Sequence, residues 1–123
     1  MKSLFLAFAF ALISFASPAV AQEENPAAAI VVATVAIEDP VKFREYAAQA
    51  QATLREFGGA PVVGGRLAET LAGDANHGLI SVVRFASVEQ ALAWYRSEAY
   101  QSLVPLRQQA GTVTLRIYAV PNS

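Results

Sequence analysis

The alternation of two kinds of apolar pattern along the chain is the feature that most constrains its fold. Four segments rich in Val, Ile, Leu and Thr, residues 30–38, 61–71, 79–85 and 112–120, are predicted to be strands. Two stretches with apolar residues at helical spacing separate them, one ending before Gly58 and one starting after Ser87. The order of elements is therefore β-α-β-β-α-β.

Local signals mark where the helices begin and end. Asp39 is predicted to cap the first helix, with Pro40 at its first position, and Gly58-Gly59 is predicted to stop it. Ser87 is predicted to cap the second helix, with Gln90 completing a capping box. These elements predict an α+β domain of ferredoxin-like arrangement, a four-stranded antiparallel sheet with both helices on one face.

Three finer expectations concern the interiors of these elements. Gly64-Gly65 is expected to mark a β-bulge or a close backbone approach. Pro105 is expected to kink or break the helical region, which ends at Gly111. Trp94 stands one position off the predicted buried stripe of the second helix, which consists of Val88, Ala91, Leu92 and Tyr95.

Residues 1–21 read as a cleavable secretory signal peptide. Lys2 precedes an apolar run that ends at Phe15, and Ala19-Val20-Ala21 provides a small-x-small cleavage site. The run of about a dozen residues is shorter than the ~20 that a membrane span needs, although an uncleaved anchor is the alternative. We therefore expect export to the periplasm or the medium, with no membrane attachment after cleavage.

Cleavage after Ala21 leaves 102 of the 123 residues. Residues 22–28 are expected to form a flexible tether and residues 29–121 one domain. Without Lys2, eight basic and ten acidic residues give a net charge of −2, which offers no electrostatic reason for a nucleic-acid partner. The chain has no cysteine, so neither a disulfide framework nor thiolate chemistry is available.

Several local motifs together resemble the domain of unknown function 1330 family. They lie between residues 29 and 120, and the most specific of them is Trp94-Tyr95-Arg96-Ser97-Glu98-Ala99-Tyr100-Gln101, followed by Pro105-Leu106-Arg107. The others are Asp39-Pro40, Tyr46, Phe57-Gly58-Gly59, Gly64-Gly65, Leu71-Ala72-Gly73 and Phe85-Ala86-Ser87. The resemblance implies a dimeric α+β barrel fold and no settled activity.

The sheet face opposite the helices also indicates a homodimer. It is expected to carry Ile30, Val32, Ile80 and Val82 beside Gly65. Four strands of ordinary length give a face of roughly 400 Å², about the largest apolar patch that a soluble monomer shows. We therefore expect two copies to pair through this open sheet face, with loops or the Pro105 segment adding contacts.

Arginines on three strands are the first candidate binding site. If Arg66, Arg84 and Arg116 all point between the paired sheets, together with Tyr118, they form a cationic cavity suited to a carboxylate or enolate. Arginine is mostly exposed in proteins, so the alternative is that they reach solvent at the strand ends.

The only histidine, His77, is a weak catalytic candidate, as a general base or an axial metal ligand near the barrel mouth. The alternative is that a histidine in an Asn-His-Gly turn is simply exposed. Trp94, Tyr95 and Tyr100 either line a pocket for an apolar ligand or serve packing alone. Arg107 either stacks on Trp94 or pairs with Glu98. No residue spacing indicates a metal site, and no cofactor is expected.

Two classes of function remain open. One is a binding or structural module whose cavity holds a small apolar or anionic molecule, or nothing. The other is a cofactor-independent enzyme, similar to the monooxygenases and isomerases of related dimeric barrels, acting on a small aromatic or lactone substrate. If the protein is an enzyme, His77 or an inward arginine should be essential for turnover. If it is a binding protein, a ligand should raise its thermal stability without any turnover.

Overall fold

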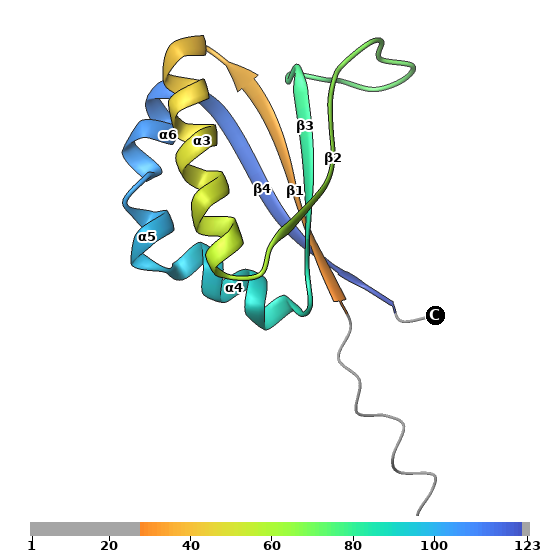
Figure 1. Cartoon of the computed structure of the whole chain (residues 1–123). Helices are drawn as coiled ribbons and strands as arrows, with labels where there is room; N and C mark the ends of the chain where they lie inside the picture. The colour runs from red at the N-terminus through yellow and green to blue at the C-terminus, as the bar shows by residue number, and fades with distance from the viewer. Residues whose placement is uncertain (1–27, 122–123) are drawn as a thin grey trace, which may run out of the picture.

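The computed structural model describes residues 28–121, which form one four-stranded antiparallel sheet with helices on one side of it (Figure 1). The strand order is β2-β3-β1-β4, so the two central strands are β3 and β1. The strands are β1 (Ala28–Ile37), β2 (Ala60–Arg66), β3 (Leu79–Phe85) and β4 (Gly111–Val120). The helices are α3 (Pro40–Glu56), α4 (Val88–Arg96), α5 (Glu98–Gln101) and α6 (Val104–Ala110). The predicted α+β, ferredoxin-like fold is confirmed.

Alternation along the central strand β1 defines the two faces of the sheet. Ala29, Val31 and Val35 are buried and point towards the helices. Ile30 and Val32 point to the opposite face, where they are only half-buried. We call the first face the helix face and the second the open face. Because directly paired residues share a face, the registers of β3 and β4 against β1 assign their side chains in the same way.

Helix α3 begins and ends where the sequence predicts. The Asp39 carboxylate accepts hydrogen bonds from the backbone N–H groups of Val41 and Lys42, each at 3.1 Å, and Pro40 is the first helical residue. At the other end Gly58 takes a φ of +82°, a conformation that other residues rarely adopt, and the chain turns back into the sheet.

The second helical region differs from a single helix because serine and proline interrupt it. Ser87 caps α4 by accepting from the Gln90 backbone N–H, and Ser97 ends α4 and caps α5. Pro105 lies in the first turn of α6, where its missing N–H costs no hydrogen bond. The predicted capping box is only half formed, since the Gln90 side chain donates instead to the Phe57 carbonyl oxygen at 2.8 Å.

The second strand departs most from the sequence prediction. Strand β2 ends at Arg66 instead of residue 71, because the turn-forming residues 73–78 provide no strand for residues 67–71 to pair with. The register shift lies between Pro61 and Val63, so Val62 is the extra residue and Gly64-Gly65 forms no bulge. A Cβ added to Gly65 would meet no atom within 4 Å, and one added to Gly64 would meet only the Ile80 carbonyl oxygen, at 3.6 Å, so no close backbone approach requires either glycine.

The hydrophobic core fills the space between the helix face and the helices. The prediction for α4 was wrong about which aromatic residue is buried there, since Trp94 is 3% exposed and Tyr95 is half-buried. Helix α4 packs against both the sheet and α3, so its buried arc is wider than one stripe. The cluster consists of Val31, Tyr46, Ala50, Val83, Phe85, Ala91, Trp94, Tyr100 and Leu103.

The predicted signal peptide and nearly all of the predicted tether lie outside the described residues. The exception is Ala28, which is buried as the first residue of β1, two residues before the predicted start of that strand. Among residues 28–121, no helix is long and apolar enough to cross a bilayer.

Candidate functional site

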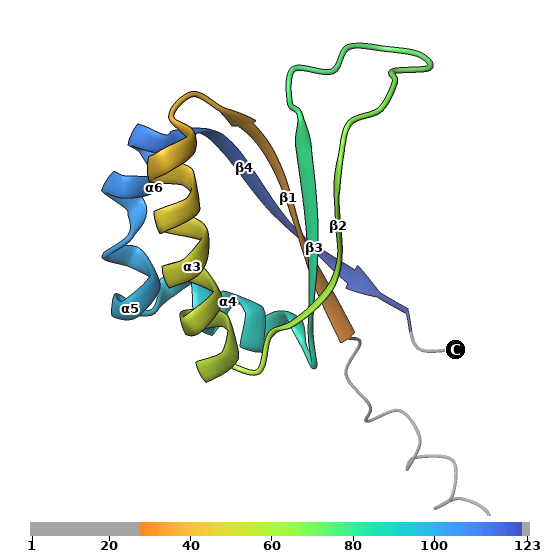
Figure 2. The ribbon, with the colours of Figure 1, turned by 45° about the horizontal axis from the view of Figure 1, so that its top comes forward.

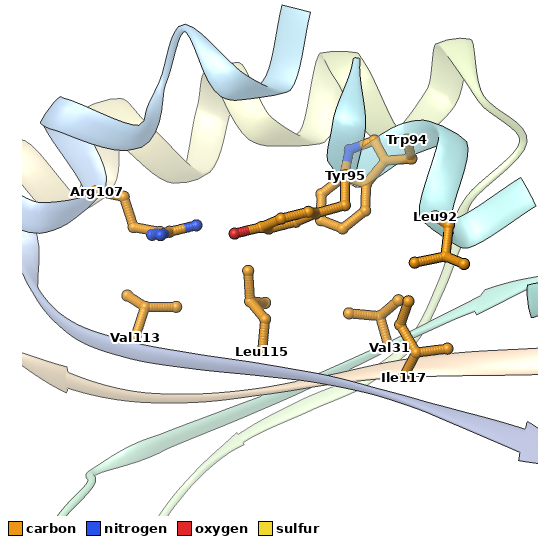
Figure 3. Close-up of a pocket in the computed structure, with 8 residues that line it drawn as sticks. All are labelled: Val31, Leu92, Trp94, Tyr95, Arg107, Val113, Leu115 and Ile117. Carbon is orange, nitrogen blue, oxygen red and sulfur yellow. The ribbon is translucent and has the colours of Figure 1, made fainter. Parts of the chain in front are cut away.

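A cavity of about 320 Å³ lies between β4 and the helices α4 and α6, and we call it the β4 cavity. Figure 3 shows aliphatic side chains of β4 and β1 on one wall and aromatic side chains of α4 on the other. The volume falls at the lower end of the ~300–1,000 Å³ that small-molecule sites occupy. The residues that line it are Val31, Leu92, Trp94, Tyr95, Arg107, Val113, Leu115 and Ile117.

Arg107 places a positive charge at one end of this otherwise apolar cavity. Its guanidinium lies at the same end as the Tyr95 hydroxyl, which points towards it (Figure 3). Among the eight lining residues, all within the described range 28–121, Arg107 is the one that carries a charge. The cavity therefore has a cationic end and an apolar body.

A buried hydrogen-bond network holds Arg107 in this position. Its Nη1 donates to the Tyr100 hydroxyl oxygen at 2.9 Å, and the hydroxyls of Tyr100 and Tyr46 share a hydrogen bond of 2.7 Å. The guanidinium carbon also lies 5.9 Å from the centre of the Tyr100 ring. A guanidinium has five N–H donors, so the bond to Tyr100 leaves donors for a ligand.

Arg107 is charged and Tyr46 is neutral, and the network shifts the pKa of each group further in that direction. Burial tends to lower the pKa of Arg107, but its hydrogen bond to Tyr100 and its proximity to Tyr95 outweigh burial and raise that pKa. Burial is the main cause that raises the pKa of Tyr46, and Tyr100 adds to the effect. The cavity thus offers a permanent cation, supported by a phenol that stays protonated.

A second cavity, about 240 Å³, lies under α3, and we call it the α3 cavity. Phe43, Tyr46 and Leu54 line it from α3, and Val83 lines it from β3. It shares four lining residues with the β4 cavity, namely Val31, Trp94, Val113 and Leu115. These four side chains are therefore the wall between the two cavities.

Two of the three candidate arginines gather on the open face, together with Tyr118. Ile30 of β1 lies between Arg84 and Tyr118, because it pairs with one on each side. Arg116 is in the next row, where it pairs with Val32. All three side chains are exposed, and they lie on the other side of the sheet from the β4 cavity.

The third arginine, Arg66, lies apart from that group and close to His77. Arg66 pairs with Leu79, and Leu79 pairs with the buried Val35, so Arg66 is on the helix face. Arg66 and His77 line a third cavity of about 450 Å³, which we call the loop cavity. Its other lining residues are Val35, Ala36, Ile37, Ala75, Asn76, Gly78 and Leu79.

Trp94 serves both packing and the site. Its indole Nε1 donates to the Thr53 hydroxyl at 2.9 Å, and its ring centre lies 4.5 Å from that of Tyr100. It thus packs on Tyr100 and also lines the β4 cavity, so the two roles that the sequence offered as alternatives occur together. Arg107 takes neither predicted role, because it bonds to Tyr100 rather than stacking on Trp94 or pairing with Glu98.

The Tyr46–Tyr100–Arg107 network is the feature that sequence reasoning missed. Its members come from α3, α5 and α6, so no periodicity within one element relates them. Tyr100 and Arg107 are seven residues apart, which is two turns of a continuous helix. They lie in two separate short helices, α5 and α6, so this spacing did not indicate their contact. No group of three or more His, Cys, Asp or Glu residues within the described part of the chain is arranged to hold a metal ion.

Comparison with solved structures places the chain in a class of small ferredoxin-like α+β domains. RPA0582, a protein of unknown function from Rhodopseudomonas palustris, aligns with a TM-score of 0.64 at 17% identity, over 79% of this chain and 85% of that one. SnoaB, a cofactor-independent oxygenase from Streptomyces nogalater, aligns with a TM-score of 0.59 at 11% identity, over 79% and 96%. A dimeric ferredoxin-like protein of unknown function from Jannaschia sp. aligns with a TM-score of 0.61 at 9% identity, over 76% and 99%.

Within that class, the chain belongs to the family described as domain of unknown function DUF1330, whose model matches residues 28–120. The resemblance read from the sequence motifs is thereby confirmed. A comparison with curated proteins gives no match. The family is described as one of unknown function.

Proposed function

We propose that the protein binds a small aromatic or other apolar molecule in the β4 cavity, with an anionic oxygen of that molecule at Arg107. The single observation that carries the proposal is the position of Arg107, a charged group at the end of an apolar cavity of about 320 Å³. A carboxylate or enolate matches the paired N–H donors of a guanidinium, and an aromatic ring matches the aliphatic and aromatic walls.

Hydrogen bonding supports binding at Arg107 rather than a purely structural role. Of the five N–H donors of Arg107, one is bound by the Tyr100 hydroxyl and the group faces the Tyr95 hydroxyl (Figure 3), so donors remain for a ligand. The Tyr95 hydroxyl stands beside it as a further donor. An anionic oxygen at this end of the cavity would meet the guanidinium N–H groups of Arg107 and the hydroxyl of Tyr95.

Thermal unfolding in the presence of ligand tests the proposal. We expect 1-naphthoate to raise the melting temperature of the wild type, and the neutral 1-naphthamide to raise it less, because only the carboxylate pairs with Arg107. In the Arg107→Gln variant the difference between the two compounds should be clearly smaller than in the wild type. Arg96→Gln, which removes an exposed arginine of α4 that lines neither cavity, is the matched control. Equal responses to both compounds in the wild type would contradict the proposal.

A second candidate function is cofactor-independent catalysis on a small aromatic or lactone substrate. SnoaB, which shares the fold, is described as a cofactor-independent oxygenase. Arg107 is placed to stabilise an enolate, as such a reaction requires. Against this candidate, the eight residues that line the β4 cavity, all in the described part of the chain, include no histidine or carboxylate to act as a base. Oxygen uptake or product formation that depends on Arg107 would favour it over simple binding.

We further propose that two copies pair through the open face. Val63, Ile80 and Tyr118 on this face are 58%, 40% and 49% exposed, so the face presents several apolar side chains to solvent. The pairing would leave the β4 cavity accessible, because that cavity lies on the helix face. The sheet alone supplies less than the ~1,600 Å² of a standard interface. The loop after β2, with the 93% exposed Leu71, is available to add contacts.

Export is the remaining part of the proposal. The apolar run before Ala19-Val20-Ala21 supports cleavage after Ala21 and release into the periplasm or the medium. Mass spectrometry of the protein from the extracytoplasmic fraction should give a chain that begins at Gln22. Recovery of the full-length chain from membranes would favour an uncleaved anchor instead.

A further inference from the structure

We propose that the loop cavity is a second and separate binding site, for a small carboxylate with an apolar end, and that Arg66 and His77 bind its anionic group. The loop of residues 67–78 leaves β2 and enters β3 at one end of the sheet (Figure 2). The cavity is lined by Arg66 at the end of β2, by residues 75–79 and by residues 35–37 of β1. It shares no lining residue with the β4 cavity. The two sites can therefore be tested independently.

Backbone hydrogen bonds fix the positions of Arg66 and His77. The N–H of Leu67 donates to the Gly78 carbonyl oxygen at 2.8 Å, which extends the β2–β3 ladder one step beyond the Arg66–Leu79 pair. The N–H of Gly78 donates in turn to the Val35 carbonyl oxygen, also at 2.8 Å. Both ends of the loop are thus anchored to the sheet.

The two side chains face the same space. Arg66 lies directly opposite Leu79, His77 is two residues before Leu79, and both residues line the loop cavity. An anionic group bound in this cavity of about 450 Å³ lies between an arginine and a histidine. A single anionic group can therefore contact both side chains.

The lining chemistry indicates the class of ligand. Arg66 brings a guanidinium, His77 a ring nitrogen and Asn76 a side-chain amide, and the nine lining residues, all among those described, include no carboxylate. Val35, Ile37 and Leu79 give the cavity an apolar side. A guanidinium binds a planar carboxylate through two parallel hydrogen bonds. The combination suits an organic acid whose hydrocarbon part rests on these three residues.

The ring signals of His77 provide a direct test, because it is the only histidine of the chain. The chain without an affinity tag is titrated with sodium benzoate, acetate or phosphate at one fixed pH, with chloride keeping the ionic strength constant. We expect a saturable change in the His77 ring chemical shifts with benzoate, and weaker binding of acetate because it lacks the apolar part. Arg66→Gln should weaken benzoate binding about tenfold or more.

Two control variants make the result specific. Arg84→Gln removes a strand arginine from the open face, and Arg107→Gln alters the β4 cavity, so both should keep the His77 response to benzoate. Failure of Arg107→Gln to bind naphthoate would bear only on the β4 cavity. The proposal is overturned if benzoate gives no saturable shift below about 50 mM, a very weak affinity. An unchanged response in Arg66→Gln, or phosphate binding at least as tightly as benzoate, would also overturn it.

Discussion

The hydrogen bonds among Tyr46, Tyr100 and Arg107 join three helices through single side chains. Tyr46 belongs to α3, Tyr100 to α5 and Arg107 to α6, and the first two are buried. Each hydroxyl is satisfied by another member of the network, so burial leaves no unpaired polar atom. At the residue scale, the cationic end of the β4 cavity is thus a product of core packing.

The raised pKa of Tyr46 predicts how stability depends on alkaline pH. Tyrosine ionises near pH 10 in the unfolded chain, whereas the folded protein holds the Tyr46 proton to higher pH. Above about pH 10 the unfolded state therefore binds fewer protons than the folded state, and the free energy of unfolding falls by up to about 1.4 kcal/mol per pH unit. Below about pH 10, Tyr46 is protonated in both states and does not change the free energy of unfolding.

Urea unfolding between about pH 8 and pH 11 measures this dependence. Tyr46→Phe should remove part of the alkaline loss, although it lowers stability at neutral pH by leaving the Tyr100 hydroxyl without that partner. Tyr118→Phe, at an exposed tyrosine of the open face, is the control and should keep the wild-type slope. A Tyr46→Phe slope equal to that of the wild type would contradict the burial argument.

Thr53 offers a second test at the residue scale. Its hydroxyl accepts the hydrogen bond of the buried Trp94 indole N–H and donates to the Ala50 carbonyl oxygen. Thr53→Val keeps the shape but leaves that N–H unpaired, so we expect a loss of about 1–3 kcal/mol in the free energy of unfolding. Thr53→Ser retains the hydroxyl and should lose less. Chemical denaturation followed by circular dichroism measures both variants.

At the scale of elements, the sequence predicts most of the fold because local signals coincide with the boundaries. The Asp39 and Ser87 caps and the β-branched run of β3 act within a few residues, so the chain itself reveals them. The end of β2 and the orientation of Trp94 depend on partners distant in sequence. Residues 67–71 have no strand to pair with, because the residues that follow them form a loop. Trp94 is buried because α3 brings Thr53 next to its indole N–H. The β4 cavity was unpredictable for the same reason.

The start of β4 gives a prediction for one element. Gly111 pairs with Ile37, and a Cβ added to Gly111 would overlap the Ala36 carbonyl oxygen. Gly111→Ala should therefore shift the β1–β4 junction and cost about 1–3 kcal/mol, as overpacking does. Gly65→Ala is the matched control, because an added Cβ there meets no atom within 4 Å. Thermal unfolding of the two variants compares them, and equal stabilities would contradict the predicted overlap.

In the molecule as a whole, one layer of helices covers the helix face and leaves the open face uncovered (Figures 1 and 2). The proposed binding site and the proposed dimer contact lie on different faces. The β4 cavity belongs to the covered face, and the exposed apolar side chains Val63, Ile80 and Tyr118 belong to the other. Arg84 and Arg116 lie beside the proposed contact, at positions where they can pair with acidic groups of a second copy.

Light scattering of the protein in solution tests the proposed dimer. The wild type should have twice the mass of one chain. Ile80→Asp should reduce it to the mass of one chain, because pairing would bury the new carboxylate between the two sheets without a partner. Val41→Asp, at a 64% exposed position of α3, should remain dimeric. A wild type that is monomeric at every concentration would contradict pairing through the open face.

Fluorescence of Trp94, the only tryptophan of the chain, tests whether Arg107 makes the β4 cavity a site for aromatic anions. Trp94 lines the cavity, so a bound nitroaromatic ring should quench it. We predict that 4-nitrobenzoate quenches with a saturable curve and binds at least about tenfold more tightly than 4-nitrobenzamide, a preference that Arg107→Gln abolishes and Arg96→Gln retains. Equal affinity of the wild type for the two compounds, or quenching that never saturates, would contradict the claim.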